Sequence, residues 1–475
     1  MEKKAFKLLH FRDTDKTFGD THQFYNEYEK KWYMIYLVFF AAPDIFTTRQ
    51  MVSDDLIHWK KEKFESEDQS VSNRLFFNDI LKANGSLFTW VPTREEGKTG
   101  AYLECFYLPD GMHNPINGWK VAPEDFFVQN DAEEYYGGLR DYSVFYDESA
   151  KKYYCLAIAY HDYSVWGHGT KIEPFLVLFE SAGDSPCKWS KKAMRLMQFD
   201  LSITGDPECC HMAKIGDRWY LFASPAGFTY RYMGKFTYWV SEKGQALKDI
   251  DWETARRYEL TGEDLCAGKI SFGEQGDIIL YGWIPDRWND SMHSSIPIQW
   301  GGNMSFPYLL SQNPDGTLTA KLADGFAEKI RGKLLYQKEF LNQPSIEINA
   351  PDSRIDMDIC FVNIDKIEIT FTNENNMHYA VEMDIQNRCL KVITENLIQT
   401  SVQLSNAWMQ QNNTLRLVIE EDMLECCLNE KYILPARTCF VMNEKCRIQV
   451  LSYSNKKEDM IQWISIHHLN TVEEI

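Results

Sequence analysis

The chain has 475 residues, which is too long for one small core and long enough for two domains. Hydrophobic residues make up 44% and aromatic residues 14% of the chain, so a large core is available, and the aromatic share is typical of β-rich proteins and sugar-stacking surfaces. The net charge of −19 argues against nucleic acids and anionic membranes as partners, because phosphate binding needs clustered Lys and Arg.

The N-terminus and the cysteines bear on the compartment. Residues 1–6 lead into polar sequence without the apolar stretch of a signal peptide, and no run of about 18 apolar residues is present to span a membrane. The 12 cysteines are dispersed and show no Cys-x-x-Cys spacing, so we expect reduced thiols in a cytoplasmic protein. Cys209, Cys210 and His211 are consecutive, but neighbours on a strand point to opposite faces, so we do not expect them to form a metal site.

Three segments of the first part of the chain share one layout, in which a carboxylate precedes a short apolar piece, a polar turn and an aromatic-rich run. Asp20, Asp141 and Glu208 each lie 11 or 12 residues before the aromatic residue that opens this run. Each segment predicts a strand, a hairpin turn and a second strand. Carboxylates at equivalent places in three copies of one unit suggest that the three side chains meet.

A longer repeat runs through the same part of the chain. Turns followed by tryptophan recur at Trp59, Trp119, Trp189 and Trp252, with spacings of 60, 70 and 63 residues. A unit of that length, made of several short strands, is typical of a propeller blade, and about 330 residues at roughly 60 per unit predict five blades. The innermost strand of each blade lines a central channel, so carboxylates at the start of these strands would point into one funnel.

The composition changes sharply near residue 333. All 26 glycines lie at or before Gly332, and 12 of the 14 tryptophans lie before residue 301. We therefore assign residues 1–330 to a propeller and residues 335–475 to a second domain, in which alternating apolar and polar residues predict an antiparallel sandwich. The predicted fold is all-β, with a five-bladed β-propeller followed by a C-terminal β-sandwich.

Two carboxylates across a glycosidic bond are the minimum apparatus for glycoside hydrolysis, and a third beside an arginine, as Arg140 is beside Asp141, would stay ionised and support the transition state. Each acid alone could instead be a turn or cap residue, but the matching offsets argue against this. His22 and His211 could be structural, and Lys269 could be either a solvated charge or a substrate contact. Aromatic residues that could stack on sugars around the rim are Trp90, Trp166, Trp283 and Trp300.

These motifs resemble glycoside hydrolase family 32, the β-fructofuranosidases, over nearly the whole chain. Glu208-Cys209 resembles the family's Glu-Cys acid/base motif, Arg140-Asp141 resembles its Arg-Asp-Pro motif, and Asp20 falls at the place of its nucleophile. Further segments that resemble family motifs are residues 53–59 (Ser-x-Asp-Leu-x-x-Trp), 282–284 (Gly-Trp-Met/Ile), 300–305 (Trp-Ala/Gly-Gly) and 415–430 (the C-terminal strand pair). The chain departs from the family at residues 17–23, where only the Asp of Trp-x-Asn-Asp-Pro-Asn-Gly is kept, at Tyr142 in place of Pro, and at residues 75–79, which lack a recognisable Phe-Ser.

The resemblance implies a retaining hydrolase of β-fructofuranosyl linkages in sucrose-like or fructo-oligosaccharide substrates, without metal or cofactor. The catalytic residues are then Asp20, Asp141 and Glu208, and the expected substrate contacts are Arg140, His22, Gln23, Lys269 and Trp283. Three alternatives stay open: an inverting five-bladed glycosidase acting on arabinan or xylan, a fructosyltransferase, and a non-catalytic sugar-binding protein. The expected partner is a small carbohydrate, and the sequence carries no signal for an oligomeric state.

Overall fold

The computed structural model describes residues 8–13, 17–40, 45–62, 79–83, 85–94, 101–109, 118–122, 127–128, 139–160, 174–190, 192–199, 207–224, 235–287, 298–341, 343–350, 354–394, 397–405, 412–438, 446–453 and 460–475. Strands dominate these ranges, beside the 3-10 helix η2 (Leu247–Asp249) and the α-helix α3 (Asp324–Lys329). No helix in these ranges is long and apolar enough to cross a membrane.

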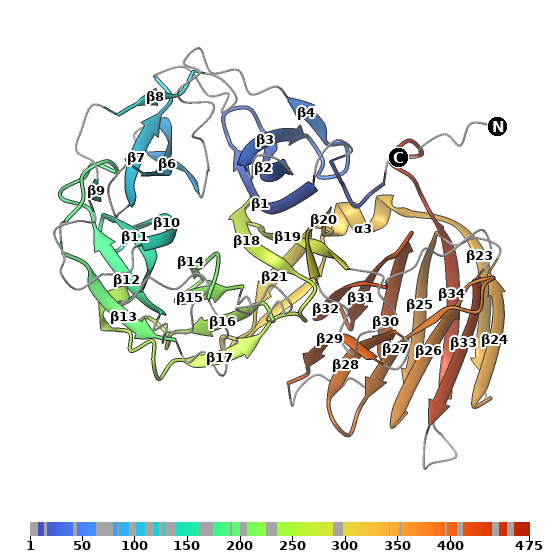
Figure 1. Cartoon of the computed structure of the whole chain (residues 1–475). Coiled ribbons are helices and arrows are strands. Elements are labelled where there is room, and N and C mark those ends of the chain that lie inside the picture. Colours follow the sequence, from blue (N-terminus) through green and yellow to red (C-terminus); the bar gives the residue numbers. More distant parts are fainter. Residues whose placement is uncertain are drawn as a thin grey trace, which may run out of the picture.

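Five small antiparallel sheets of the described residues stand around a central axis and form a five-bladed β-propeller (Figure 1). The first blade contains β1 (Thr17–Asn26), β2 (Lys31–Phe40), β3 (Ile45–Ser53) and β4 (Lys60–Glu62). The second contains β5 (Ile80–Ala83), β6 (Ser86–Arg94), β7 (Ala101–Tyr107), β8 (Lys120–Val121) and β9 (Phe127–Val128). The third contains β10 (Leu139–Asp147), β11 (Lys152–Tyr160), β12 (Pro174–Glu180) and β13 (Met194–Gln198). The fourth contains β14 (His211–Ile215), β15 (Arg218–Ala223), β16 (Thr237–Val240) and β17 (Arg256–Glu259). The fifth contains β18 (Cys266–Phe272), β19 (Ile278–Arg287), β20 (Ile298–Met304), β21 (Tyr308–Gln312) and β22 (Leu318–Leu322).

The first strand of each blade lies nearest the axis, and the next strand is almost continuously apolar. β15 is buried along its whole length, because both faces of a blade pack against neighbouring blades. The repeated tryptophans lead into the outer strands. Trp119 and Trp252 are buried, whereas Trp59 and Trp189 are partly buried and pack against the cores.

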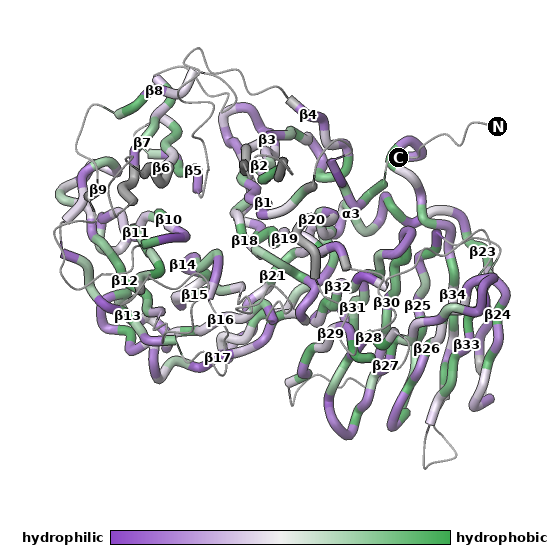
Figure 2. Tube along the Cα trace, viewed as in Figure 1, coloured by the Kyte–Doolittle hydropathy of each residue, from purple (hydrophilic) through white to green (hydrophobic). Residues whose placement is uncertain are grey.

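Two six-stranded antiparallel sheets follow the propeller and form a sandwich. One sheet has the order β23 (Arg331–Leu341), β34 (Met460–Leu469), β25 (Ile355–Val362), β30 (Asn413–Glu420), β31 (Met423–Leu428) and β32 (Tyr432–Arg437). The other has the order β24 (Ser345–Ala350), β33 (Cys446–Tyr453), β26 (Lys366–Thr372), β27 (His378–Asp384), β28 (Cys389–Thr394) and β29 (Leu397–Gln403). Burial alternates along β26, so that one face of this strand packs into a core shared by both sheets. Figure 2 shows apolar residues along these strands and polar residues at many of the turns.

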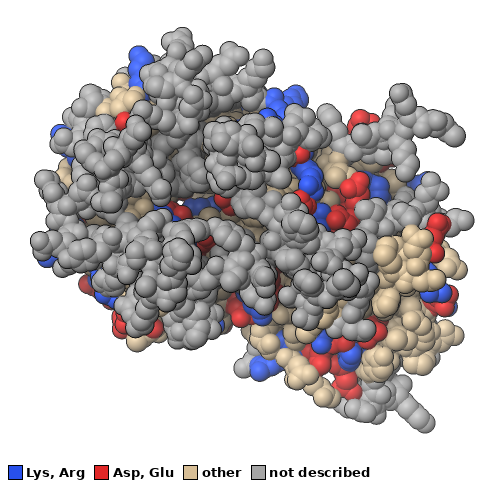
Figure 3. All heavy atoms as spheres, viewed as in Figure 1, with Lys and Arg blue, Asp and Glu red and all other residues tan. Residues whose placement is uncertain are grey.

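Charged groups join the two domains. In Figure 3, acidic and basic side chains lie side by side where the propeller meets the sandwich. Arg437, on sandwich strand β32, donates to the backbone oxygens of Pro285 (3.0 Å) and Ile284 (3.2 Å) on β19, and its guanidinium also binds Asp422 (2.8 Å). The sandwich thus reaches the propeller strand that carries Trp283.

His10 makes the most buried of these contacts. Its Nδ1 lies 2.8 Å from Glu420 Oε2 and its Nε2 lies 3.2 Å from Glu425 Oε1, and all three side chains are almost inaccessible. The imidazole stacks on Phe306, with ring centroids 3.8 Å apart. Burial alone would lower the pKa of His10, but the hydrogen bonds and charges of the two glutamates outweigh it and raise the pKa above its ordinary 6.5. The protonated ring therefore links residues near the N-terminus to β30 and β31.

Replacing His10 by Gln tests this link. The substitution removes the imidazolium charge that lies between the buried carboxylates of Glu420 and Glu425. We therefore expect a loss of about 3–5 kcal/mol in the free energy of unfolding. Because the pKa of His10 is raised in the folded state, its contribution is full below about pH 6.5 and declines as the pH rises through the folded-state value. Denaturant unfolding at pH 6 and pH 9 should therefore show a larger difference between wild type and H10Q at pH 6. The partly exposed His58 provides the control H58Q, and an equal loss from H10Q at both pH values would contradict this account.

Candidate active site

Three innermost strands carry the same irregularity near their first residues. The antiparallel ladder gains one extra residue between Gly19 and His22 in β1, between Arg140 and Ser143 in β10, and between Cys266 and Lys269 in β18. In each strand, two residues thus lie opposite one residue of the partner strand. The first of the two has a left-handed backbone: Asp20 (φ 45°), Asp141 (φ 52°) and Ala267 (φ 47°). Such β-bulges bend a strand and redirect a side chain, and they usually place Gly at this position. Two of these strained positions hold carboxylates.

The fourth blade has its left-handed residue two positions before β14 begins, and this residue is Cys209 (φ 52°). Asp20, Asp141 and Cys209 are thus the equivalent positions, and Glu208 corresponds to Arg140. The prediction that the three carboxylates occupy equivalent positions is therefore wrong for Glu208, which lies one residue before the equivalent position. Sequence spacing hid this because the hairpin turn at residues 216–217 is shorter than the four-residue turns at 27–30 and 148–151.

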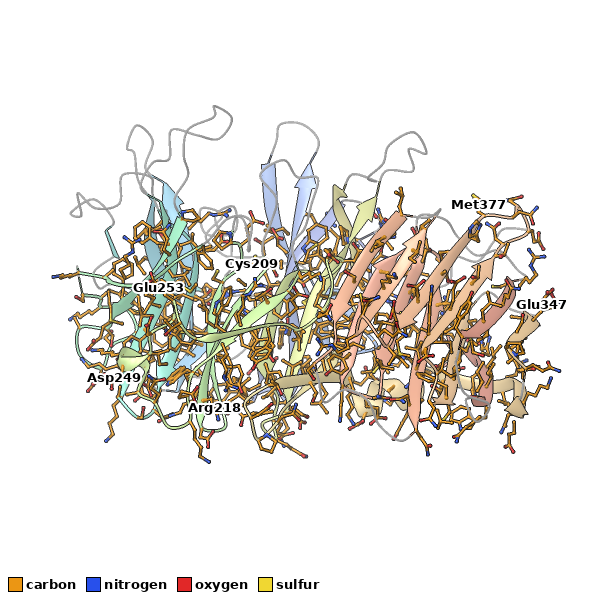
Figure 4. The ribbon with its side chains drawn as sticks, turned by 90° about the horizontal axis from the view of Figure 1, so that it is seen from below. Cys209, Arg218, Asp249, Glu253, Glu347 and Met377 are labelled. Carbon is orange, nitrogen blue, oxygen red and sulfur yellow. The ribbon has the colours of Figure 1, made fainter. Side chains whose placement is uncertain are left out.

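The one-residue offset brings Glu208 and Arg140 together. Arg140 Nη1 donates to Glu208 Oε1 (3.0 Å), and Nη2 donates to the carbonyl oxygen of Pro207 (3.0 Å). The backbone N–H of Cys209 donates to Asp141 Oδ2 (2.7 Å). Basic and acidic side chains are visible in the hollow at the centre of the propeller (Figure 3). Figure 4 shows Cys209 and Arg218 at the two ends of the fourth blade's hairpin, with Arg218 near the lower edge of the propeller in that view and Cys209 well above it.

Burial and mutual repulsion shift the carboxylates that meet here. Burial and the charge of Asp141 raise the pKa of Asp20 to about 6, against the lowering effects of a hydrogen bond from Trp283 and of the Arg140 cation. Burial raises the pKa of Glu208 to about 7; Arg140 opposes this shift, and Asp141 and Asp20 add to it. Between pH 6 and 7, Glu208 is therefore at least about half protonated and Asp20 at least about half ionised. One acid and one base occur at one site near neutral pH.

A second layer of polar side chains lies one step further along these strands, two residues after each left-handed position. The residues at these positions are His22, Ser143, His211 and Lys269. Asp79 of the second blade lies beside them and completes the layer. His22 Nε2 lies 3.4 Å from Asp79 Oδ1, and Asp79 Oδ2 accepts the N–H of Val144 (2.8 Å). Ser143 was not among the residues predicted for the site. Four of the five residues occupy the same position relative to the left-handed residue of their blade. An alignment of the blade sequences at that residue, instead of at the aromatic run, places these four in one column.

Lys269 determines the charge of this layer. Burial and the Lys269 cation lower the pKa of His22 and of His211 well below the ordinary value, so both rings are neutral. The contact between His22 and Asp79 is therefore a hydrogen bond and not an ion pair. Burial raises the pKa of Asp79, and Lys269 opposes that shift. Lys269 is only 7% exposed, so it lies within the layer rather than on the open surface.

Two predicted substrate contacts have other surroundings. Gln23 is fully buried, and its amide donates to the backbone oxygens of Lys269 (2.6 Å) and Ile279 (3.1 Å), so it joins the first blade to the fifth and does not line the channel. Trp283 is 1% exposed and lowers the pKa of Asp20, so it supports the carboxylate instead of offering a face to a sugar. Trp90 is equally buried, and Trp166 and the Trp300 side chain lie outside the described residues.

The consecutive Cys209, Cys210 and His211 do not form a metal site. Cys210 is fully buried in the apolar core, whereas Cys209 is partly exposed. In the described part of the chain, no group of three or more His, Cys, Asp or Glu side chains is arranged to hold a metal ion.

Residues 10–321 match the sequence model of the glycosyl hydrolases family 32 N-terminal domain. The chain belongs to glycoside hydrolase family 32. No curated protein sequence matches it, so it is a divergent member.

Solved structures of this family share its fold. A Bombyx mori β-fructofuranosidase is 13% identical, with a TM-score of 0.71 over 98% of this chain and 93% of its own. A sucrose-6-phosphate hydrolase from Lactobacillus gasseri is 15% identical, with the same TM-score and coverage. An exo-inulinase from Aspergillus awamori is 14% identical, with a TM-score of 0.69 over 98% of both chains. The five-bladed propeller and the sandwich predicted from the sequence are thus confirmed.

Proposed function

We propose that this family 32 protein is a retaining glycoside hydrolase that cleaves β-fructofuranosyl linkages in sucrose-like or fructo-oligosaccharide substrates. The observation that carries the proposal is the proximity of Asp20, Asp141, Glu208 and Arg140, with pKa values of about 6 for Asp20 and about 7 for Glu208. Relatives of the same fold were solved with sucrose and with fructosylnystose, which supports this substrate class.

In the first step, an Asp20 oxygen attacks the anomeric carbon and the bond to the leaving oxygen breaks. That oxygen keeps the electron pair and takes the proton of Glu208. Asp141, oriented by the N–H of Cys209, stabilises the positive charge that develops on the sugar ring. The buried Trp283 lowers the pKa of Asp20 and so favours the ionised form that must attack.

In the second step, Glu208 takes a proton from water, the water oxygen attacks the anomeric carbon, and Asp20 leaves with the electron pair. The charge of Asp20 is one cause of the raised pKa of Glu208. Once Asp20 is esterified, that charge is gone and the pKa of Glu208 falls. The same carboxyl group is then better suited to act as the base.

Replacing Glu208 by Gln and Asp20 by Asn tests these roles. We expect E208Q to lose roughly 10²- to 10⁴-fold in kcat on sucrose or inulin-type oligosaccharides, because the leaving oxygen loses its acid, and D20N to lose at least as much. Matched controls are E253Q and D249N, which lie on the outer side of the propeller away from Cys209 (Figure 4) and should keep wild-type rates.

Product stereochemistry and turnover separate the alternatives. Retention at the anomeric carbon, followed by polarimetry, supports the proposal, whereas inversion supports a single-displacement glycosidase. Transfer to a second sugar in place of water would indicate a fructosyltransferase. Binding without turnover on sucrose, fructo-oligosaccharides, levan and difructose anhydrides would contradict catalysis altogether.

The paired pKa values predict a narrow pH optimum. Asp20 must be ionised, so kcat/KM should rise as the pH increases through about 6, and Glu208 must be protonated, so kcat/KM should fall as the pH increases through about 7. The two apparent values belong to the coupled pair. Rates measured from pH 4 to 9 should give a bell with its maximum between about pH 6 and 7. A rate that stays constant up to pH 9 would contradict the assignment of Glu208 as the acid.

A further inference from the structure

The turn before β14 carries two groups of the candidate site. Glu208 supplies its side chain, and the next residue, Cys209, supplies the backbone N–H that donates to Asp141 Oδ2 at 2.7 Å. Cys209 holds a left-handed backbone (φ 52°), which is unfavourable for a residue other than glycine. A strained turn of this kind persists only where its surroundings hold it.

His211 is one of the groups that hold this turn. Its Nε2 accepts the backbone N–H of Ile270 on β18 (3.3 Å), so this nitrogen carries no proton. The ring proton is therefore on Nδ1, which donates to the carbonyl oxygen of Cys209 (3.2 Å). The ring is 4% exposed and stacks on Phe222, with ring centroids 4.8 Å apart. His211 thus connects the peptide of Cys209 to the fifth blade.

Ser224 holds the same turn from its other side. Its backbone N–H donates to the carbonyl oxygen of Glu208 (2.9 Å), and its hydroxyl oxygen accepts the N–H of Gly268 (3.0 Å). Gly268 and Ile270 flank Lys269 on β18, directly after the left-handed Ala267. The turns of the fourth and fifth blades are therefore fixed against each other by two side chains.

We infer that His211 is a positioning residue of the hydrolytic site, which acts through the Cys209 peptide to aim its N–H at Asp141. This inference rests on the proposed function and adds a role for a residue that touches no substrate. The neutral ring with its proton on Nδ1 is needed, because only this form serves both neighbours. Burial and the Lys269 cation maintain the neutral form by lowering the pKa of His211.

A series of substitutions at His211 tests the inference. H211N keeps a donor near the place of Nδ1, H211Q keeps an acceptor near the place of Nε2, and H211F keeps only the stacking on Phe222. We expect H211F and H211Q to lose about 10- to 100-fold in kcat with little change in KM, and H211N to stay within a few-fold of wild type. Rescue by Asn and not by Gln would not follow from a role in ring packing alone.

S241A is the matched control in the same blade. Ser241 is buried, and its hydroxyl oxygen accepts the N–H of Trp219 (2.9 Å). Its carbonyl oxygen accepts a hydrogen bond from Arg218 (2.9 Å). Figure 4 shows Arg218 well away from Cys209, at the other end of the hairpin. The control should lower Tm without changing kcat.

Amide hydrogen exchange provides a readout that does not depend on turnover. Exchange in the peptide covering residues 208–212 should become faster in H211F and stay unchanged in S241A. If the wild type turns over no fructoside, the proposed function fails, and the exchange data alone decide whether His211 holds the turn. The inference is overturned if H211F keeps the kcat and the exchange rate of the wild type. It is also overturned if H211N loses as much kcat as H211F. If H211F does not fold, the comparison of H211N with H211Q decides.

Discussion

The left-handed residue at or just before the start of the innermost strand, found in four of the five blades, is the constraint on which the candidate site depends. A regular strand would send successive side chains to alternating faces, and no spacing along it would aim an Asp and the neighbouring strand's Glu at the same point. The extra residue in β1 and β10 turns Asp20 and Asp141 toward the axis. In the fourth blade Cys209 takes the left-handed position, so its N–H, and not its side chain, faces Asp141.

The electrostatic properties of the site follow from this convergence. Three carboxylates lie near one cation, Arg140, in a partly desolvated place, and the charge of Asp141 disfavours ionisation of both Asp20 and Glu208. The charge of Asp20 therefore adds to the raised pKa of Glu208, and the two carboxyl groups differ in protonation near neutral pH. The layer beneath contributes Lys269, which opposes the rise in the pKa of the buried Asp79, and two neutral imidazoles.

Much of this could be predicted from the sequence, because blade repeats, turn residues and alternating strands are local patterns. The five-bladed propeller, the sandwich and the family followed from them, and so did the choice of Asp20, Asp141 and Glu208 as candidate residues. The one-residue offset of Glu208 could not be predicted, because it depends on a turn length that spacing alone does not separate from a bulge. The contacts of Gln23 and His10 could not be predicted either, since their partners are distant in the sequence and adjacent only after the ring closes and the domains pack.

The central claim is that Asp20 attacks the sugar while Glu208 serves as acid and then as base. It is tested most directly by mass spectrometry of a Glu208→Ala variant incubated with a β-fructofuranoside that has a good leaving group. Such a substrate needs no acid in the first step, whereas the second step lacks its base, so the ester should accumulate. The account predicts one hexosyl group on the peptide that contains Asp20. A hexosyl group on any other residue, or complete turnover with inversion and no labelled peptide, would contradict it.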